Sequence, residues 1–306
     1  MLAIRLSTRR VILAASVAAL GVVAAADRAV AQARLDARYT ASLAGLPIGE
    51  GSWLITIAEN DYSAAAQGAA VGLMKAFTGG YGQTVTRGTL QGGKPVMSSY
   101  VASIHSYKKA NEISLKVDGG SVKDLKLDPP AETEPERVPI TDATKNGVLD
   151  PMTATLVRMS GNGDVVAPEA CQRTLAVFDG RLRYDLNLAF KRIDTVKAGK
   201  GYAGPAVVCS VYFTPVAGYI PTRAAIKYLK EQRQMEIWLA PIVGTRVLVP
   251  FRIEGPTPVG RAVLEADEFV VSALPPKEPV KASAKPRERD KDKSARAAAS
   301  EAGTTP

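Results

Sequence analysis

The chain has 306 residues, of which 39 are Lys or Arg, 30 are Asp or Glu, one is His and two are Cys, and its formal net charge is +9. A chain of this length allows one large β domain or two smaller ones, and a hydrophobic content of 46% excludes a wholly disordered or fibrous protein. One histidine and two cysteines are too few for a zinc site built from Cys and His.

The first 31 residues have the pattern of an export signal. Arginines open the segment, residues 11–26 are uncharged and rich in alanine, and Ala29-Val30-Ala31 fits the site that signal peptidase cleaves. We therefore expect a signal peptide at 1–31, a mature protein that begins at Gln32, and a location in the periplasm. The alternative is an uncleaved membrane anchor, but a span needs about 20 strongly apolar residues and this run is shorter.

Two adjacent arginines, Arg9 and Arg10, also resemble the start of a twin-arginine signal. That route usually serves folded or cofactor-loaded proteins, and no cofactor motif follows in this chain. We favour the general secretory route, expect no cofactor, and expect no membrane-spanning segment after cleavage.

Residues 32–274 alternate apolar and polar side chains, which is typical of half-buried strands, and we expect them to form one β-rich domain. Residues 45–49 read as a turn, and Asp118-Gly119-Gly120 and Asp179-Gly180 as hairpin turns. Pro250 interrupts one strand, which indicates an edge position or a bulge. Strands are expected at 35–43, 53–57, 113–117, 122–127, 175–177, 182–190, 207–213, 235–240, 246–253 and 261–271.

Helices are few. Residues 71–77 predict a short helix that ends at Gly79-Gly80, and residues 221–233 predict another. Asp150-Pro151 fits an N-cap followed by proline, so a third helix is expected at 152–159. Residues 128–148, rich in Pro, Glu and Thr, read as a long loop that divides the sheet unequally.

Strands and helices do not alternate along the chain, which argues against an α/β fold. The sequence predicts an all-β, mainly antiparallel fold: a large curved sheet or an open or spiral β-barrel with two or three short helices.

Residues 275–306 contain Pro, Ala, Ser and many charges but no aromatic residue, so we expect a disordered charged tail. This tail and residues 1–31 each carry a net charge of +3, which leaves only +3 on residues 32–274. A nucleic-acid surface needs a concentrated basic patch, so we expect no nucleic-acid partner. The tail reads as a solubilising segment, or alternatively as a contact to an envelope protein or the cell wall.

Cys171 and Cys209 are 38 residues apart in a protein expected to be exported. An even number of cysteines in an oxidising compartment predicts a disulfide between them. The alternative, a reactive thiol, lacks a C-x-x-C motif, and the only histidine, His105, is distant in sequence.

No catalytic constellation is evident, and we expect a protein that is not an enzyme, with no metal site. His105 reads as a solvent-facing strand residue, because no G-x-S-x-G motif accompanies it. Asp and Glu are scattered without the spacing of metal ligands. A pair of carboxylates that hydrolyses a polymer is left open, because the separation of two carboxylates is set in three dimensions.

Aromatic residues are spread over many of the expected strands. The inner face of a strongly curved sheet either fills its own interior or leaves a cavity for a ligand. If a cavity exists, the candidate residues lining it are Trp53, Tyr81, Tyr100, Tyr184 and Trp238.

Several short motifs occur in an order that resembles a bacterial periplasmic envelope family, domain of unknown function 3108. They are Val148-Leu149-Asp150-Pro151-Met152-Thr153-Ala154, Cys171, residues 177–186, Cys209 with 212–219, residues 238–240, residues 249–253, Gly260, and residues 264–266. The resemblance implies a periplasmic β-rich protein of spiral or half-open barrel type and brings no catalytic residues. In layout the chain is also similar, more distantly, to periplasmic lipoprotein carriers, which hold acyl chains in an apolar concavity.

Three functions follow in order of preference. The first is a non-enzymatic periplasmic protein that binds a lipid or another apolar small molecule of the envelope in the concavity of its sheet. The second is a structural or protein-interaction module of the envelope that adds a partner strand to its open sheet edge. The third, with least support, is a hydrolase of cell wall or polymer.

Overall fold

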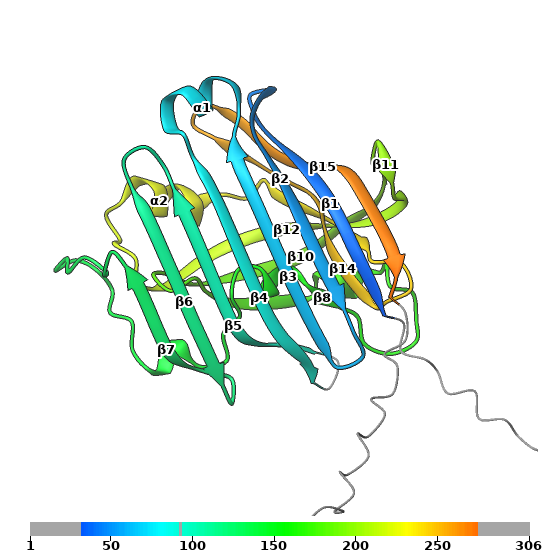
Figure 1. The fold of residues 1–306 in the computed structure, drawn as a ribbon, viewed down its shortest axis with the longest axis horizontal. Helices are drawn as coiled ribbons and strands as arrows, with labels where there is room; N and C mark the ends of the chain where they lie inside the picture. Colours follow the sequence, from blue (N-terminus) through cyan, green and yellow to red (C-terminus); the bar gives the residue numbers. More distant parts are fainter. Residues whose placement is uncertain (1–31, 92–93, 275–306) are drawn as a thin grey trace, which may run out of the picture. The chain divides into compact units, whose positions relative to one another are not determined.

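The computed structural model of the protein describes residues 32–91 and 94–274, all of which belong to one compact unit. The predicted signal peptide at 1–31 and the predicted tail at 275–306 lie outside the described residues (Figure 1). None of the helices within the described ranges is long and apolar enough to cross a membrane.

The strands of the described chain form one sheet of 15 strands. They are β1 (Ala33–Leu43), β2 (Leu46–Ile57), β3 (Asp61–Ala70), β4 (Tyr81–Gln91), β5 (Lys94–His105), β6 (Ala110–Asp118), β7 (Ser121–Asp128), β8 (Val157–Arg158), β9 (Arg173–Phe178), β10 (Arg183–Lys197), β11 (Lys200–Gly201), β12 (Ala203–Ala217), β13 (Met235–Pro241), β14 (Val247–Thr257) and β15 (Gly260–Ala273).

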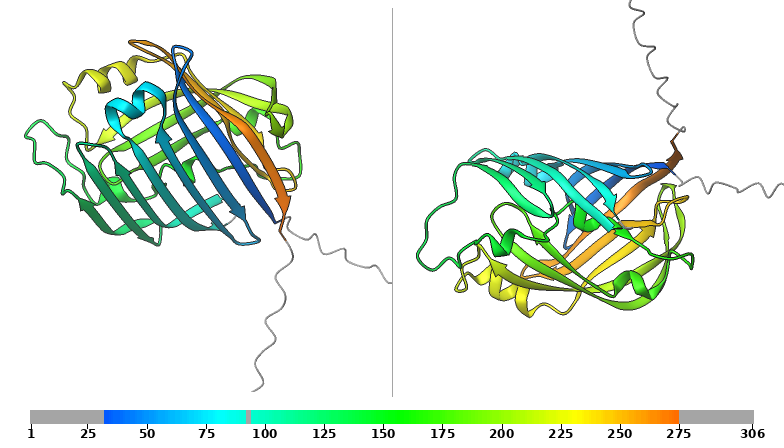
Figure 2. Two further views of the ribbon diagram at one scale, coloured as in Figure 1. Left: turned by 45° about the horizontal axis from the view of Figure 1, so that its top comes forward. Right: turned by 90° about the horizontal axis from the view of Figure 1, so that it is seen from below.

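The sheet is antiparallel along its main path and open at both edges. Its order is β7-β6-β5-β4-β3-β2-β1-β15-β14-β13-β12-β10-β9, with β8 beside β14 and the short β11 parallel to β15. Figure 2 shows the sheet curling so that β2–β7 face β9–β14, with β1 and β15 at the fold between them. The prediction of a mainly antiparallel, open β-barrel type of fold is therefore confirmed.

The loop that follows β7 lies between the two sheet edges, as expected for a segment that divides the sheet. The backbone N–H of Gly147 donates to the carbonyl oxygen of Gly120 in the hairpin of β6 and β7 (2.8 Å). Two residues later, the N–H of Leu149 donates to the carbonyl oxygen of Ala176 in β9 (2.8 Å). One short segment thus joins two edges that do not pair with each other.

The prediction of a helix at 152–159 is wrong. Asp150 does cap this segment, because its Oδ1 accepts the backbone N–H groups of Met152 (2.9 Å) and Thr153 (3.0 Å). Only the 3₁₀ turn η2 (Thr153–Thr155) forms, however, and β8 begins two residues later. Val157 pairs with Leu248 of β14, so pairing with the sheet overrides the helical tendency of this segment.

Two α-helices lie at one end of the sheet, which we call the helix end. Helix α1 (Gly72–Thr78) connects β3 to β4 and ends at Gly79 with a φ of 55°, as predicted. Helix α2 (Ala224–Glu231) connects β12 to β13 inside the predicted range. Figure 2 shows both helices at this end. At the opposite end, the N–H of Leu274 donates to the carbonyl oxygen of Gln32 (3.0 Å).

The first strand shows why the alternating pattern works as a signal here. Its inward residues, such as Leu35, are buried, and the intervening residues, such as Asp36, are exposed. The turn that follows is shorter than the predicted 45–49. It consists of Ala44 and Gly45, both with positive φ, as in two-residue hairpins, and β2 begins at Leu46.

Pro250 lies in a bulge and not at an edge. Strand β14 runs between β13 and β15, and its pairing with β13 shifts where Trp238 and Leu239 face Arg252 and Pro250. Proline has no backbone N–H to donate, and Pro250 lies where the hydrogen bonding between β13 and β14 is already irregular.

The disulfide between Cys171 and Cys209 is confirmed, with a Cα–Cα distance of 5.5 Å. Cys171 ends the 3₁₀ turn η3 (Pro168–Cys171), Cys209 lies in β12, and both are fully buried. The bond fixes the segment before β9 against the sheet, inside a cluster that includes Leu239 and Leu248.

Candidate ligand-binding site

The first cavity of the curled sheet has a volume of about 580 Å³. Its wall comes mainly from β1–β5. Side chains of β14, of β15 and of residues 129–156, the segment between β7 and β8 that we call the inner loop, complete it. Residues in the wall include Tyr39, Ala41, Ile48, Trp53, Ala66, Ala70, Ile104, Met152, Thr155, Ile253 and Leu264. Glu50, Ser52, Gln67 and His105 also border the cavity, but the surface that lines it is mainly apolar.

Glycines open the space on this side. Gly51 of β2 lies opposite Gly68 of β3, which lies opposite Gly82 of β4, so three adjacent strands carry no side chain in one row. The backbones approach closely there, because a Cβ on Gly51 would lie 2.8 Å from the carbonyl oxygen of Gln67. Only backbone therefore separates the first cavity from a polar hollow on the outer face, which the same three glycines line.

The second cavity has a volume of about 560 Å³ and adjoins the first. The two share five lining residues: Ala41, Ile48, Thr155, Ile253 and Leu264. The rest of the second wall comes from β9, β10 and β12–β14 and is again mostly aliphatic, with Leu175, Leu186, Leu188, Val211, Ile237 and Leu239. The two walls of the curled sheet thus enclose a bipartite apolar space.

Three of the five predicted aromatic residues line these cavities. Trp53 lies in the wall of the first cavity, with its ring centroid 6.2 Å from that of Tyr39. Tyr81 lies at the border of the first cavity and stacks on His105 with a centroid distance of 4.8 Å. Tyr184 lines the second cavity and packs on Phe213.

The prediction is wrong for Tyr100 and Trp238, which line neither cavity. Tyr100 is buried in the core beneath β5 and β6 with Leu115 and Phe178, where desolvation raises the pKa of its hydroxyl to about 12. Trp238 points to the face of β13 opposite to Ile237, because successive side chains of a strand alternate. Sequence alternation alone does not say which of two apolar neighbours faces inward.

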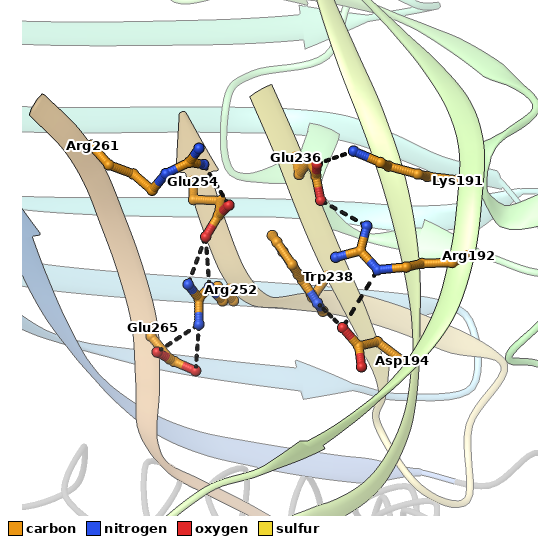
Figure 3. A network of polar contacts seen from close by, with 9 residues as sticks. All are labelled: Lys191, Arg192, Asp194, Glu236, Trp238, Arg252, Glu254, Arg261 and Glu265. Carbon is orange, nitrogen blue, oxygen red and sulfur yellow. Dashed lines mark hydrogen bonds and ion pairs between the residues drawn. The ribbon is translucent and has the colours of Figure 1, made fainter. Parts of the chain in front are cut away.

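Trp238 is buried in the core cluster that also contains Trp53, and it forms the centre of a polar network (Figure 3). The guanidinium carbons of Arg192 and Arg252 lie 5.3 and 5.1 Å from the centroid of its ring, and its Nε1 donates to Asp194 (3.1 Å). The hydrogen bond from the indole, together with Arg192, holds the pKa of the Asp194 carboxyl below its usual range.

Carboxylates complete the network. Glu236 binds Lys191 and Arg192, and Glu254 binds Arg252 (2.6 Å) and Arg261 (2.6 Å). Both glutamates also border the second cavity, next to the cavity-lining Ile237 and Ile253. Their charges are compensated there by neighbouring cations.

A second polar cluster fixes the inner loop against the sheet. The Asp150 side chain is fully buried, and its Oδ2 accepts hydrogen bonds from the hydroxyls of Thr153 (2.5 Å) and Thr86 of β4 (2.8 Å). Tyr62 of β3 bonds to Thr153 in turn (2.8 Å). Burial raises the pKa of Asp150, and the hydrogen bonds to its carboxylate oppose that rise. The sequence indicated the N-cap role of Asp150 but gave no sign of its partners across the sheet.

A family comparison bears on this arrangement. The model of a protein family of unknown function, DUF3108, matches residues 38–267, which include both cavities, Asp150 and the disulfide. The chain belongs to the DUF3108 family. No curated protein matches the sequence.

A similar solved structure is the β-barrel-like protein of the domain of unknown function DUF1849 from Brucella abortus. It is 11% identical, with a TM-score of 0.44, and the alignment covers 80% of this chain and 99% of that one.

The DUF3108 domain also carries a cationic cavity of about 620 Å³ at its helix end. Five basic side chains lie in its wall, together with the carboxylate of Glu132. These basic residues are Lys108, Lys109, Arg137, Arg181 and Arg223. The arginines also position the loops here, since Arg137 donates to the carbonyl oxygen of Gly218 (2.6 Å) and Arg181 to that of Pro129 (2.7 Å).

His105 lies close to acidic and hydroxyl groups. Its Nε2 is 2.7 Å from Oγ of Ser103 and 3.1 Å from Oε1 of Glu112. Within 32–91 and 94–274, no three His, Cys, Asp or Glu residues are placed to hold a metal ion.

Proposed function

We propose that the DUF3108 domain is a periplasmic, non-enzymatic protein that binds an apolar or amphiphilic envelope component, such as a lipid acyl chain. One observation carries the proposal: two adjoining apolar cavities share five wall residues inside a sheet that is open at its edges. Cavities of roughly 300–1,000 Å³ are the usual size for small-molecule sites. Binding would be driven by burial of acyl surface, at about 25 cal/mol per Å² of apolar area removed from water.

The indole of Trp53 favours a ligand that carries a hydrogen-bond acceptor. Its Nε1 is buried and has no hydrogen-bond partner among the described residues, although Trp53 lies in the wall of the first cavity. A buried N–H without an acceptor costs free energy. An ester, carboxyl or hydroxyl oxygen of a bound amphiphile would supply that acceptor, so an amphiphile fits the site better than a pure hydrocarbon.

The first experiment identifies what the protein carries. The protein is purified from its native host without detergent, extracted with organic solvent, and examined by mass spectrometry. A lipid or other amphiphile in stoichiometric amount supports the proposal, and its absence from extracts of the folded protein counts against it.

The two tryptophans allow a second, site-specific test, because Trp53 lines a cavity and Trp238 does not. A brominated fatty acid that enters the first cavity is expected to quench the fluorescence of Trp53 more strongly than that of Trp238. Trp238→Phe reports Trp53 alone, and Trp53→Phe reports Trp238 alone. Equal quenching in both variants would place the fatty acid outside the cavity.

A substitution that fills the shared wall provides the third test. Ala41 lines both cavities, so Ala41→Phe is expected to weaken binding of a fluorescent fatty acid at least tenfold. Ala203→Phe is the matched control, since Ala203 is exposed at the opposite end of the sheet. Unchanged binding by a folded Ala41→Phe variant would contradict the proposed site.

A second candidate function, strand addition by a protein partner, has one observation in its favour. Strand β7 is an edge of the sheet, and among the described strands it pairs only with β6. Its first residue, Ser121, also forms an isolated bridge with Asn146. Exposed edges can accept a partner strand. Photo-crosslinking from Lys126 in cells would capture such a partner, and the absence of any crosslinked protein would remove this candidate.

A further inference from the structure

Helix α1 presents apolar side chains to solvent. None of its residues is buried, and Leu73 and Phe77 are 73% and 76% exposed. Helix α2 differs, because its Ile226 and Leu229 are half-buried against the sheet. A two-turn helix that buries none of its large apolar side chains gains no stability from them within the domain.

Neighbouring loops extend this surface. The N–H and hydroxyl of Tyr107, in the loop between β5 and β6, donate to carbonyl oxygens of Thr78 (2.9 Å) and Lys75 (3.2 Å) of α1. Helix α1 starts beside β2, where Val71 donates to Ile48 (3.0 Å). The N–H of Ala44, in the turn between β1 and β2, likewise donates to the carbonyl oxygen of Arg261 at the start of β15 (2.9 Å).

We call the exposed apolar side chains of these segments the apolar rim. It consists of Leu46, Leu73, Met74, Phe77, Tyr107 and Val259, which are between 36% and 76% exposed. Figure 1 shows α1 and the tips of the β1–β2 and β14–β15 hairpins gathered at the same end. Apolar side chains clustered in this way, unlike scattered ones, indicate an interaction surface.

Within the segments that carry the rim, the charged side chains have one sign. Lys75, Lys108 and Lys109 lie in its segments, and residues 44–48, 71–80, 106–109 and 257–260 contain no Asp or Glu. None of the three lysines forms an ion pair with another described residue. Lys108 and Lys109 also line the cationic cavity, so positive charge continues from the rim toward α2.

The rim adjoins the first apolar cavity at the end where its lining residues Tyr81 and Ile104 are exposed to solvent. Ile48, Gly80, Tyr81 and Ile104 line this cavity and lie next to rim residues in the chain or in the sheet. A ligand that leaves the cavity at this end would pass the rim first.

We propose that the apolar rim docks the protein on the surface of an anionic phospholipid bilayer. Leu73, Phe77 and Tyr107 would enter the boundary between headgroups and acyl chains, and the lysines would lie at the level of the phosphates. Partly inserted apolar side chains flanked by lysine are the features that bind proteins to bilayer interfaces. The proposal rests in part on the proposed function, because docking would place that end of the first cavity against a source or acceptor of its ligand.

Charge distinguishes a bilayer from a second copy of the chain at this surface. In a two-fold dimer the same patch meets itself, so like-charged lysines would face one another. An anionic bilayer offers the opposite charge across the whole rim. The lysine-only composition of the rim segments therefore favours the bilayer.

The test uses the full chain, expressed with its own N-terminal segment and purified in the form that the host produces. Flotation is measured with vesicles of phosphatidylcholine alone and with vesicles that also contain phosphatidylglycerol. The variants are Leu73→Ser/Phe77→Ser and Lys75→Gln/Lys108→Gln/Lys109→Gln, and Val243→Ser is the control. Val243 is also exposed (58%) but lies in the β13–β14 turn at the opposite end.

The unmodified protein is expected to float with phosphatidylglycerol vesicles and to be released by high salt. Loss of both apolar side chains should weaken partitioning at least tenfold, and loss of each lysine about fivefold. Val243→Ser should bind like the unmodified protein. Absence of binding to anionic vesicles, or equal binding by the rim variants and the control, would overturn the proposal. So would light scattering that shows a dimer which only the rim substitutions dissociate.

Failure of docking and failure of the proposed function are separable. Binding of a fluorescent fatty acid without vesicles reports the cavity alone, and the rim variants should retain it. A protein that binds the fatty acid but no vesicle would overturn the docking surface and leave the cavity. A protein that floats with anionic vesicles but binds no fatty acid would overturn the proposed function of the cavity and leave the docking surface.

Discussion

Thr86 and Asp150 are 64 residues apart in sequence and are joined by a hydrogen bond of 2.8 Å between Oγ1 and Oδ2 inside the curled sheet. Both residues are fully buried. The inner loop, which bridges the two sheet edges, is fixed by this bond to β4, in the middle of the wall that β2–β7 form. The position of the inner loop, and with it the shared wall of the two cavities at Thr155, depends on this contact.

Replacement of Asp150 by alanine is expected to lower the free energy of unfolding by about 3 kcal/mol, because buried donors of Thr86, Thr153 and Met152 lose their acceptor. Urea denaturation measures the change. Asp142→Ala is the matched control: Asp142 also precedes a 3₁₀ turn, but its side chain is fully exposed. We expect a change within about 0.5 kcal/mol for the control, and equal losses in the two variants would refute the role of Asp150.

The pH dependence of stability should show the buried state of Asp150. Burial raises its pKa in the folded protein above the ordinary 3.8, so the folded state binds this proton more tightly than the unfolded chain. The resulting stability is fully present below the ordinary value and is lost as the pH rises through the folded-state pKa. Compared with Asp150→Asn, the unmodified protein should therefore lose stability as the pH rises above the ordinary value of 3.8. A difference that does not change with pH would contradict the raised pKa.

Removal of the disulfide by Cys171→Ala/Cys209→Ala is expected to lower the free energy of unfolding by up to about 4 kcal/mol, because the bond closes a loop between residues separated by 38 positions. The same shift should follow when the unmodified protein is reduced. A thiol titration of denatured, non-reduced protein should find no free thiol, and two thiols would show that the bond is not formed.

Gly88→Ala tests the tight contact between β3, β4 and β5. A Cβ on Gly88 would lie 2.2 Å from the carbonyl oxygen of Val96 and 2.4 Å from the hydroxyl of Tyr62, which bonds to Thr153. We expect a loss of at least about 2 kcal/mol in the free energy of unfolding. Gly163→Ala, where a Cβ meets no atom within 4 Å, should be close to neutral. Equal thermal midpoints of the two variants would show that β4 can shift to accept the methyl group.

The strands that the sequence predicts well are those whose inward side chains are large. In β1, Leu35, Ala37 and Tyr39 alternate with exposed polar residues, and the hairpin at Gly119-Gly120 has the residues that its turn requires. Strands β3 and β4 are not predicted by the sequence, and of β5 only its end at His105 is. Many inward positions of β3 and β4 hold Ala, Gly or Thr, as in Ala64, Gly68 and Thr84, so the hydrophobic alternation is weak there. The same small side chains that leave room for the first cavity weaken the hydrophobic alternation from which its strands could be predicted.

The candidate site could be predicted only in part, for a related reason. Trp53, Tyr81 and Tyr184 line the cavities, but Trp238, next to the cavity-lining Ile237, packs into the core instead. Two adjacent apolar residues give no periodicity that distinguishes the two faces, and the bulge at Pro250 shifts the register there. The sequence does not indicate the apolar rim, because the exposure of Phe77 depends on the tertiary structure around α1.

The pairing of β1 with β15 has a consequence for how the domain folds. The first and last strands lie side by side in the middle of the sheet, between β2 and β14. The seam between the two walls therefore cannot close until the final strand has been synthesised, and contacts of such long sequence separation form slowly. A chain that stops before Gly260 would leave β1 and β14 as two unprotected edges at its centre. Such a product would be prone to aggregation and would have to be kept unfolded or degraded.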